Sequence, residues 1–460
     1  QCKTIKMIDN SRRRFIANFS MLATGYSLSA GNILLAHPVK IVDPVVPNNK
    51  PATVASDGKL NFSFGDERLV LNGGLQPSML VTNNNRMIVQ AQNANKPIPQ
   101  ERIYYPFGVD TVISDDTGAT WTKKEMFPGK NDVNIEGGIV QLKDGTIIGL
   151  ETYVTPGAKP DTGETLLFYS TDGLKTVKGP VTAIFEIPHS NFYASSDDGG
   201  RPHVAMRLHR RIIEMPNGDL MTTIYGWQKG DKSPSDYEVH MIKTRVMVFR
   251  SSNKGRHWKY VSSITTIPQT QTEGFGEPVL NRVNKGKHAG RLICMMRTGR
   301  ELFQCYSDNQ GKTWSQPLPL IFADRDVYAI EKWKDMFKEV KRKGIFVPEN
   351  SIEIVGAVVD PDLCVLRSGL LVATFGLRIP AKACWQKFTH PWNGNYMAVS
   401  TDGGDSWGNV IQLTSAIPTT HYTAVEEMKE GNTLFITYDW GFWGYKPGRY
   451  IYGRTVKIKS

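Results

Sequence analysis

The chain has 460 residues, of which 40% are hydrophobic and 22% charged, as in ordinary globular proteins, and its formal net charge is +11. A net charge of +4 falls within residues 1–36, which leaves a modest basic excess that favours encounter with acidic ligands; no basic run interleaved with aromatic residues indicates a nucleic-acid partner. Five cysteines without a paired C-x-x-C spacing exclude a disulfide framework and a cysteine-based zinc site.

The N-terminal region is predicted to direct export. Ser11-Arg12-Arg13-Arg14-Phe15-Ile16 resembles a twin-arginine signal, and the weakly apolar stretch that follows is too short and too interrupted for a transmembrane helix. We therefore expect an export signal over residues 1–36, cleaved after Ala30 or Ala36, a linker over residues 37–58 and a folded domain over residues 59–460. The protein would be periplasmic or extracellular. The alternative for this region is a disordered basic N-terminus.

An eight-residue pattern recurs with a serine, an acidic or amide residue, a glycine and an aromatic residue at fixed offsets. In the copy from Ser114 to Trp121, the Asp or Asn position is suited to accept hydrogen bonds from turn amides and the glycine to adopt a positive φ, while the tryptophan packs between strands. The pattern therefore indicates structure rather than catalysis. Good copies begin at Ser114, Ser251, Ser307 and Ser400, and a degraded fifth copy begins at Ser170.

A longer repeat consists of a polar residue, an apolar strand, a turn and a second apolar strand. Successive turns are 60 to 79 residues apart, a length that fits one four-stranded antiparallel blade each. The turn residues are Asn85, Gly145, Gly218, Gly290, Gly369 and Gly431. The sequence thus predicts an all-β, six-bladed β-propeller, closed by pairing of Leu60–Phe64 with Tyr450–Lys459. An amphipathic helix is predicted as an insertion over residues 324–343.

One polar residue precedes the innermost strand of every predicted blade. Inner strands line the channel of a propeller and ligands bind at its mouth, so we expect these side chains to lie close together. The alternative is a solvated channel that carries no chemistry. The six residues are Gln76, Glu136, His209, Glu277, Asp360 and Tyr422.

The eight-residue pattern is similar to the Asp-box of sialidases and other bacterial-neuraminidase-repeat proteins. The resemblance implies a sialidase-like propeller with Asp-boxes on its outer rim. It also implies a tyrosine nucleophile activated by a glutamate, a separate acid/base aspartate and an arginine triad for the substrate carboxylate. By position it assigns Tyr422 as nucleophile, Glu277 as the glutamate and Arg297 as a triad arginine, with Arg378 as a looser match. A neutral tyrosine avoids repulsion from the substrate carboxylate.

Two parts of the family pattern are missing here. The first-blade arginine is absent, since its segment reads Leu75-Gln76-Pro77-Ser78-Met79. Losing one bidentate clamp on a carboxylate would cost about 2–3 kcal/mol of binding. The acid/base aspartate is not identified: Asp110 is a candidate by position, and Glu136 or Asp360 could replace it.

These observations predict an exo-acting glycoside hydrolase on a terminal, acidic sugar of a glycan or polysaccharide. Glu277, Tyr422, Asp360 and Glu136 are its candidate catalytic residues, because most glycosidases use a pair of carboxyl groups. Substrate contacts are expected from Arg297, Arg378, His209, Gln76, Tyr225 and Arg201. We expect no cofactor and no metal, and the sequence leaves the oligomeric state open.

Two alternatives remain. A polysaccharide lyase on uronate polymers would need a histidine or tyrosine base and a cation beside the uronate. Its candidates are Arg201, His203, His209, Tyr225, Arg297 and Tyr422. A non-catalytic carbohydrate-binding propeller would instead stack sugar rings on loop tryptophans. These are Trp227, Trp385, Trp392, Trp440 and Trp443.

Overall fold

The computed structural model describes residues 53–54, 59–93, 96, 108–193, 196–197, 201–202, 204–235, 242–264, 273–320, 357–378, 393–415, 417, 419–441 and 448–459. All of them belong to one compact unit, Pro44–Ser460. The predicted export signal, the predicted helix over residues 324–343 and three of the loop tryptophans (Trp385, Trp392 and Trp443) lie outside the described residues. Within the described ranges, no helix has the length and apolar character needed to cross a membrane.

The described chain is all-β apart from one short 3-10 helix, η1 (Ile135–Gly137), and groups of four antiparallel strands recur along it. Separate four-stranded sheets are β4–β7 and β20–β23; β24–β27 gain β1 at one edge, and β28–β30 are completed by β2 and β3. The strands of these sheets are β1 (Thr53–Val54), β2 (Asn61–Phe64), β3 (Arg68–Asn72), β4 (Leu75–Val81), β5 (Met87–Asn93), β6 (Gly108–Ser114), β7 (Thr122–Lys124), β20 (Gly276–Arg282), β21 (Leu292–Arg297), β22 (Leu302–Ser307), β23 (Leu318–Pro319), β24 (Ala357–Val365), β25 (Leu371–Arg378), β26 (Gly394–Ser400), β27 (Gly408–Gln412), β28 (Thr423–Glu427), β29 (Thr433–Gly441) and β30 (Arg449–Lys459).

The middle of the chain differs from the predicted separate blades, because its strands form one ten-stranded sheet. The strands are β8 (Ile139–Gln141), β9 (Ile147–Leu150), β10 (Tyr153–Pro156), β11 (Thr162–Ser170), β12 (Lys178–Glu186), β15 (Met206–Leu208), β16 (Ile213–Glu214), β17 (Leu220–Gly226), β18 (Arg245–Ser251) and β19 (His257–Ile264). The outer strands β12 and β19 pair in parallel at Ile184–His257 and Phe185–Trp258, and β10 bridges β11 and β15. The parallel pairing satisfies edge N–H and C=O groups that would otherwise remain open. A further two-stranded sheet joins β13 (Ser196–Asp197) and β14 (Arg201–Pro202).

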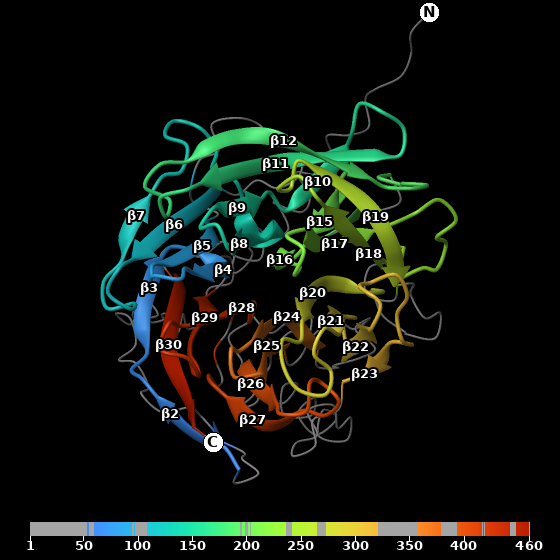
Figure 1. Cartoon of the computed structure of the whole chain (residues 1–460). Coiled ribbons are helices and arrows are strands. Elements are labelled where there is room, and N and C mark those ends of the chain that lie inside the picture. Colours follow the sequence, from blue (N-terminus) through green and yellow to red (C-terminus); the bar gives the residue numbers. More distant parts are fainter. Residues whose placement is uncertain are drawn as a thin grey trace, which may run out of the picture. The chain divides into compact units, whose positions relative to one another are not determined.

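The sheets of this unit are set around a common centre (Figure 1). Strand β20 contacts β24, β24 contacts β28, β28 contacts β4 and β4 contacts β8, while β17 contacts β20. The succession therefore closes on itself in a propeller-like arrangement. The predicted closure is confirmed, because β2 pairs with β30 from Asn61–Lys459 to Phe64–Val456.

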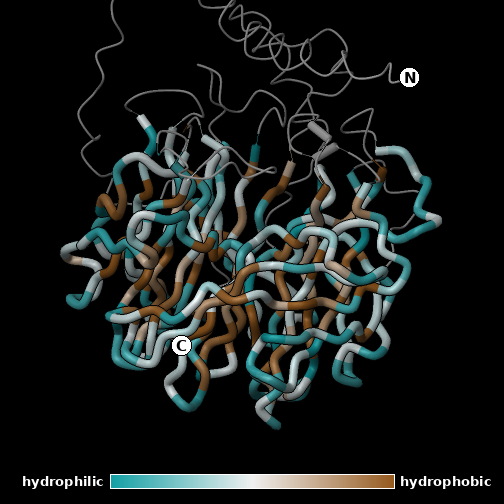
Figure 2. The backbone as a smooth tube through the Cα atoms, turned by 90° about the horizontal axis from the view of Figure 1, so that it is seen from above, coloured by the Kyte–Doolittle hydropathy of each residue, from teal (hydrophilic) through white to brown (hydrophobic). Residues whose placement is uncertain are grey.

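The hydrophobic core lies between neighbouring sheets. One cluster, for example, combines Val279 of β20 and Met295 of β21 with Val358 of β24 and Phe375 of β25, all fully buried. Figure 2 shows the same distribution, with hydrophobic residues along the strands and hydrophilic residues at many of the connecting turns. The apolar side chains thus fill the space between sheets, and polar residues that start the inner strands are left for the centre.

The five eight-residue turns share one hydrogen-bond pattern. Ser114 donates to Asp116 at 2.7 Å and accepts from the N–H of Gly118 at 2.9 Å, while Asp116 accepts from the N–H of Thr120 at 2.9 Å. The other four copies repeat these bonds. Gly118 has φ +82°, which glycine adopts at little cost. The pattern has the structural role predicted for it.

Candidate active site

Three of the six polar positions lie at β-bulges. Gln76, Glu277 and Asp360 each precede a proline and have φ values of 59°, 41° and 49°. The strand register is interrupted at each of these places. Proline has no N–H to donate to the ladder, and non-glycine residues with positive φ cost energy that the surrounding structure must supply. A polar residue followed by proline therefore produces the same local geometry in three sheets.

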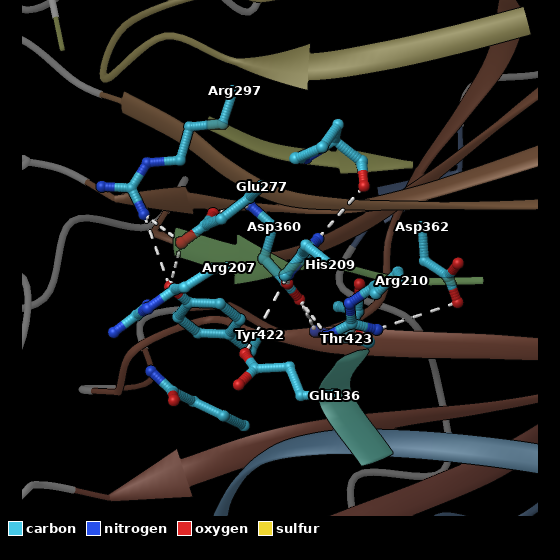
Figure 3. A network of polar contacts seen from close by, with 12 residues as sticks. Glu136, Arg207, His209, Arg210, Glu277, Arg297, Asp360, Asp362, Tyr422 and Thr423 are labelled. Carbon is cyan, nitrogen blue, oxygen red and sulfur yellow. Dashed lines mark hydrogen bonds and ion pairs between the residues drawn. The ribbon is translucent and has the colours of Figure 1, made fainter. Parts of the chain in front are cut away.

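Tyr422 and Glu277 come from different sheets and meet at the centre (Figure 3). The Tyr422 hydroxyl donates a hydrogen bond to Oε1 of Glu277. Nη1 of Arg297 lies 2.6 Å from that same oxygen and 3.4 Å from the Tyr422 hydroxyl. The N–H of Asp360 donates to Oε2 of Glu277 at 3.0 Å. The Glu277 carboxylate thus accepts hydrogen bonds from a tyrosine, an arginine and the backbone of a neighbouring inner strand.

A second carboxyl group, that of Asp360, is fully buried behind this pair. Its Oδ2 accepts from Nη2 of Arg210 at 2.7 Å and from the N–H of Thr423 at 2.8 Å, and its Oδ1 lies 3.3 Å from Nε2 of His209. Nδ1 of His209 lies 3.3 Å from the Pro278 carbonyl, which can only accept, so we assign the ring proton to Nδ1. Nε2 is then the unprotonated nitrogen of a neutral ring, and it faces the Asp360 carboxyl group.

Glu136 approaches the same histidine from another direction. It lies in η1 and not at the start of a strand as predicted, because the Asn134 side chain accepts its N–H at 3.1 Å and caps this short helix. Oε2 of Glu136 accepts from Nε2 of Gln92 at 2.9 Å, and Oε1 lies 4.0 Å from Nε2 of His209. Glu136 keeps 6% of its surface exposed, whereas Asp360 keeps none.

The carboxyl groups of Glu277, Asp360 and Glu136 differ in the direction in which their pKa values are shifted. Burial tends to raise the pKa of Glu277, but the charges of Arg297 and His209 and the Tyr422 hydrogen bond outweigh it and lower the pKa to about 2. Burial raises the pKa of Asp360 well above its usual value despite the charge of Arg210, and burial also raises the pKa of Glu136. Burial, followed by the charge of Arg210, lowers the pKa of His209 to about 4. At neutral pH Glu277 is therefore ionised and His209 is neutral, while the pKa values of Asp360 and Glu136 are shifted in the opposite direction to that of Glu277.

Two further predicted residues lie beside the pair. Arg378 ends β25, and its guanidinium carbon is 5.4 Å from the centre of the Tyr422 ring, while its Nε donates to the Thr420 carbonyl at 2.8 Å. The Tyr225 hydroxyl accepts from Nη1 of Arg207 at 3.2 Å, and its ring meets that of His209 edge to face at 6.3 Å. Both are therefore part of the same polar centre.

Other candidates are placed differently. Gln76 is half-buried and its N–H donates to Asp439 at 3.2 Å. The side chain of Arg201 and all of His203 lie outside the described residues. Asp110 bonds to Nδ2 of Asn93 at 2.5 Å and lies 2.9 Å from Nζ of Lys123. Burial opposes ionisation of Asp110, yet these two partners lower its pKa, so it is poorly suited to donate a proton.

The described tryptophans contribute little exposed stacking surface. Trp227 is 3% exposed, and its Nε1 donates to the Ile242 carbonyl at 2.7 Å. Trp440 packs against Tyr450, with 5.4 Å between ring centres. Both rings are used for packing within the protein.

Three site residues were not among the candidates predicted from sequence: Glu273, Arg207 and Arg210. Arg210 directly follows His209, and Glu273 lies four residues before Glu277, so chain proximity was the available signal. Nη2 of Arg207 donates to the Tyr153 hydroxyl at 3.2 Å. The described residues hold no group of three or more His, Cys, Asp or Glu side chains arranged to bind a metal ion.

The chain is similar in fold to several solved structures, at low sequence identity. No protein family and no curated protein sequence matches the chain. A solved protein of unknown function from Dyadobacter fermentans is similar with a TM-score of 0.55 and 16% identity, over 86% of this chain and 99% of that one. An α-L-arabinanase of Penicillium chrysogenum is similar with a TM-score of 0.47 and 12% identity, over 85% of this chain and 98% of that one. A sialidase of Streptococcus pneumoniae is similar with a TM-score of 0.45 and 9% identity, over 83% of this chain and 68% of that one. The likeness to the Dyadobacter protein concerns the fold alone.

Proposed function

We propose that the chain is a six-bladed, sialidase-like β-propeller that acts as a retaining exo-glycoside hydrolase. The observation that carries this proposal is the Tyr422 hydroxyl bonded to Glu277, with Arg297 on the same carboxylate oxygen. A tyrosine becomes a nucleophile when an adjacent base takes its proton, and Glu277 is the group positioned to do so. Of the remaining carboxyl groups, Asp360 is fully buried and Glu273 is paired with Arg297, so Glu136 is our candidate for the acid.

The proposed reaction has two balanced steps. The Tyr422 oxygen bonds to the anomeric carbon as the glycosidic bond breaks, Glu277 takes the phenolic proton and Glu136 gives a proton to the leaving oxygen. Water then attacks the anomeric carbon, its proton passes to Glu136, and the tyrosine regains its proton from Glu277. Since Glu277 has a pKa of about 2, proton transfer accompanies bond formation to Tyr422 rather than preceding it.

The six-blade count rests on two supports. The recurring four-strand groups, including the two that merge into the ten-stranded sheet, follow the predicted repeat. The five serine turns have the geometry expected of Asp-boxes, each starting at the last residue of a strand, as at Ser114 in β6. Export through the predicted signal over residues 1–36 belongs to the same proposal and would place the enzyme where glycans are accessible.

The lyase alternative has less support. It would use His209 as a base, but this residue is 2% exposed and its two nitrogens face Pro278 and Asp360. A base must lie within hydrogen-bond reach of the proton that it abstracts. Tyr422 would then have to serve as base instead, and the products would reveal it.

The test is incubation of the purified protein with sialylated glycans, neutral oligosaccharides and uronate polysaccharides, with product mass and ultraviolet absorbance read together. Hydrolysis adds the mass of water without new absorbance, and Tyr422→Phe should abolish it. Tyr193→Phe is the matched control, since Tyr193 is 76% exposed. New absorbance without added water would favour a lyase. Hydrolysis that persists in Tyr422→Phe would refute the proposed nucleophile.

A further inference from the structure

Arg297 is held by two carboxylates of the protein. Its Nη2 donates to Oε2 of Glu273 at 3.4 Å, and its Nε lies 2.6 Å from Oε1 of the same residue as an ion pair. Its Nη1 lies 2.6 Å from Glu277. All three nitrogens therefore face carboxylate oxygens, and the three residues are no more than 8% exposed.

The backbone fixes Glu273 in this place. Its N–H donates to the Thr298 carbonyl at 3.1 Å, and its own carbonyl accepts the N–H of Thr244 at 3.0 Å. Gly274 has φ +92°, and a Cβ there would come within 2.4 Å of the Thr244 nitrogen. A Cβ at Gly299 would lie 3.4 Å from the Glu273 carboxyl carbon. Gly274 thus allows the backbone beside Glu273 to approach Thr244 closely, and Gly299 lies next to the Glu273 carboxyl group.

We propose that Glu273 is a specificity-determining residue that fills the carboxylate-binding edge of Arg297, so that the site selects a neutral terminal sugar over an acidic one. This inference rests on the proposed glycosidase function. A guanidinium recognises a carboxylate through two parallel N–H bonds, and the Glu273 carboxylate already occupies the edge of the guanidinium that carries Nε and Nη2. An acidic sugar would have to displace Glu273 or approach a guanidinium whose charge two carboxylates already balance, which like-charge repulsion disfavours.

This inference revises the acidic substrate expected from the sequence. That expectation required Arg297 to be open to a substrate carboxylate, as the family resemblance implies. In the structure the chain supplies the carboxylate itself. The remaining features of the proposed reaction, Tyr422 as nucleophile and Glu277 as its base, do not depend on a charged sugar.

The test is a binding measurement, so it does not depend on finding a hydrolysable substrate. Isothermal titration calorimetry would compare N-acetylneuraminic acid and D-glucuronate on the wild type, Glu273→Ala and Glu273→Gln, with exposed Glu125→Ala as control. Both Glu273 variants should bind the acids about tenfold more tightly than the wild type or better. The gain should weaken with added salt and disappear when Arg297→Met is added.

One result would overturn the proposal: Glu273 variants that keep the wild-type circular dichroism spectrum but bind the acids no more tightly than the wild type does. Glu273→Gln preserves the side-chain shape and guards against loss of folding in Glu273→Ala. Absence of hydrolysis in every assay would count against the proposed function but would leave this comparison interpretable.

Discussion

Glu277→Gln should weaken folding as well as abolish activity. From the sequence alone, this change at a site residue is expected to leave the melting temperature nearly unchanged. The structure alters that expectation, because Glu277 accepts from the Tyr422 hydroxyl, from Arg297 at 2.6 Å and from the N–H of Asp360 at 3.0 Å. A glutamine has one acceptor oxygen, and its amide would face one of these donors, leaving a buried group unsatisfied.

The pKa of Glu277 sets the size of the effect. A carboxyl group whose pKa falls from 4.5 to about 2 on folding contributes about 3 kcal/mol to stability when ionised. Because the folded pKa is the lower one, this contribution is fully present above about pH 4.5 and is lost as the pH falls toward 2. The stability gap between wild type and Glu277→Gln should therefore be about 3 kcal/mol at pH 7 and close progressively below pH 4.5.

The assay is equilibrium urea unfolding followed by tryptophan fluorescence at pH 7 and at pH 3. Exposed Glu125→Gln is the matched control and should change neither curve. Using the gap between two proteins cancels the contributions of carboxyl groups that Glu277 does not influence, such as Asp116. A gap that is the same at both pH values, or below about 0.5 kcal/mol at pH 7, would refute the reasoning.

Three other changes can be assessed. Tyr422→Phe should lower kcat/KM by about a thousandfold or more, with Tm within about 3 °C of wild type; a large loss of Tm would make the tyrosine structural. Glu67, next to the start of β3, accepts a hydrogen bond from the Tyr438 hydroxyl of β29. Glu67→Gln should therefore lower Tm without affecting activity. A double-mutant cycle with Tyr438→Phe should give a coupling free energy of about 1 kcal/mol. Asp116→Asn should leave Tm unchanged, because Asn253 occupies the equivalent turn position. Asp116→Ala should lower Tm, and the same calorimetric Tm for both variants would contradict this.

The repeats made much of the fold predictable. A serine, an acidic or amide residue and a glycine at fixed offsets close a turn through local hydrogen bonds, so the five turns could be recognised without tertiary information. The closing strand was predictable because β2 is a short alternating segment with a complementary partner in β30. The parallel junction of β12 and β19 was not, because it joins two outer edges that no sequence period relates.

The site, like the fold, has features that could be predicted from the sequence and features that could not. Position in the repeat identified Glu277, Asp360 and Tyr422, since a polar residue at the start of an inner strand must point to the shared centre whatever the loops do. The sequence by itself therefore determined which strands would supply polar groups. Only the tertiary structure decided that Glu273 forms an ion pair with Arg297 and that Arg210 donates a hydrogen bond to Asp360. It also decided that the pKa of Glu277 is lowered. These outcomes depend on distances between segments far apart in the chain and on burial, to which Coulomb energies and pKa values respond steeply.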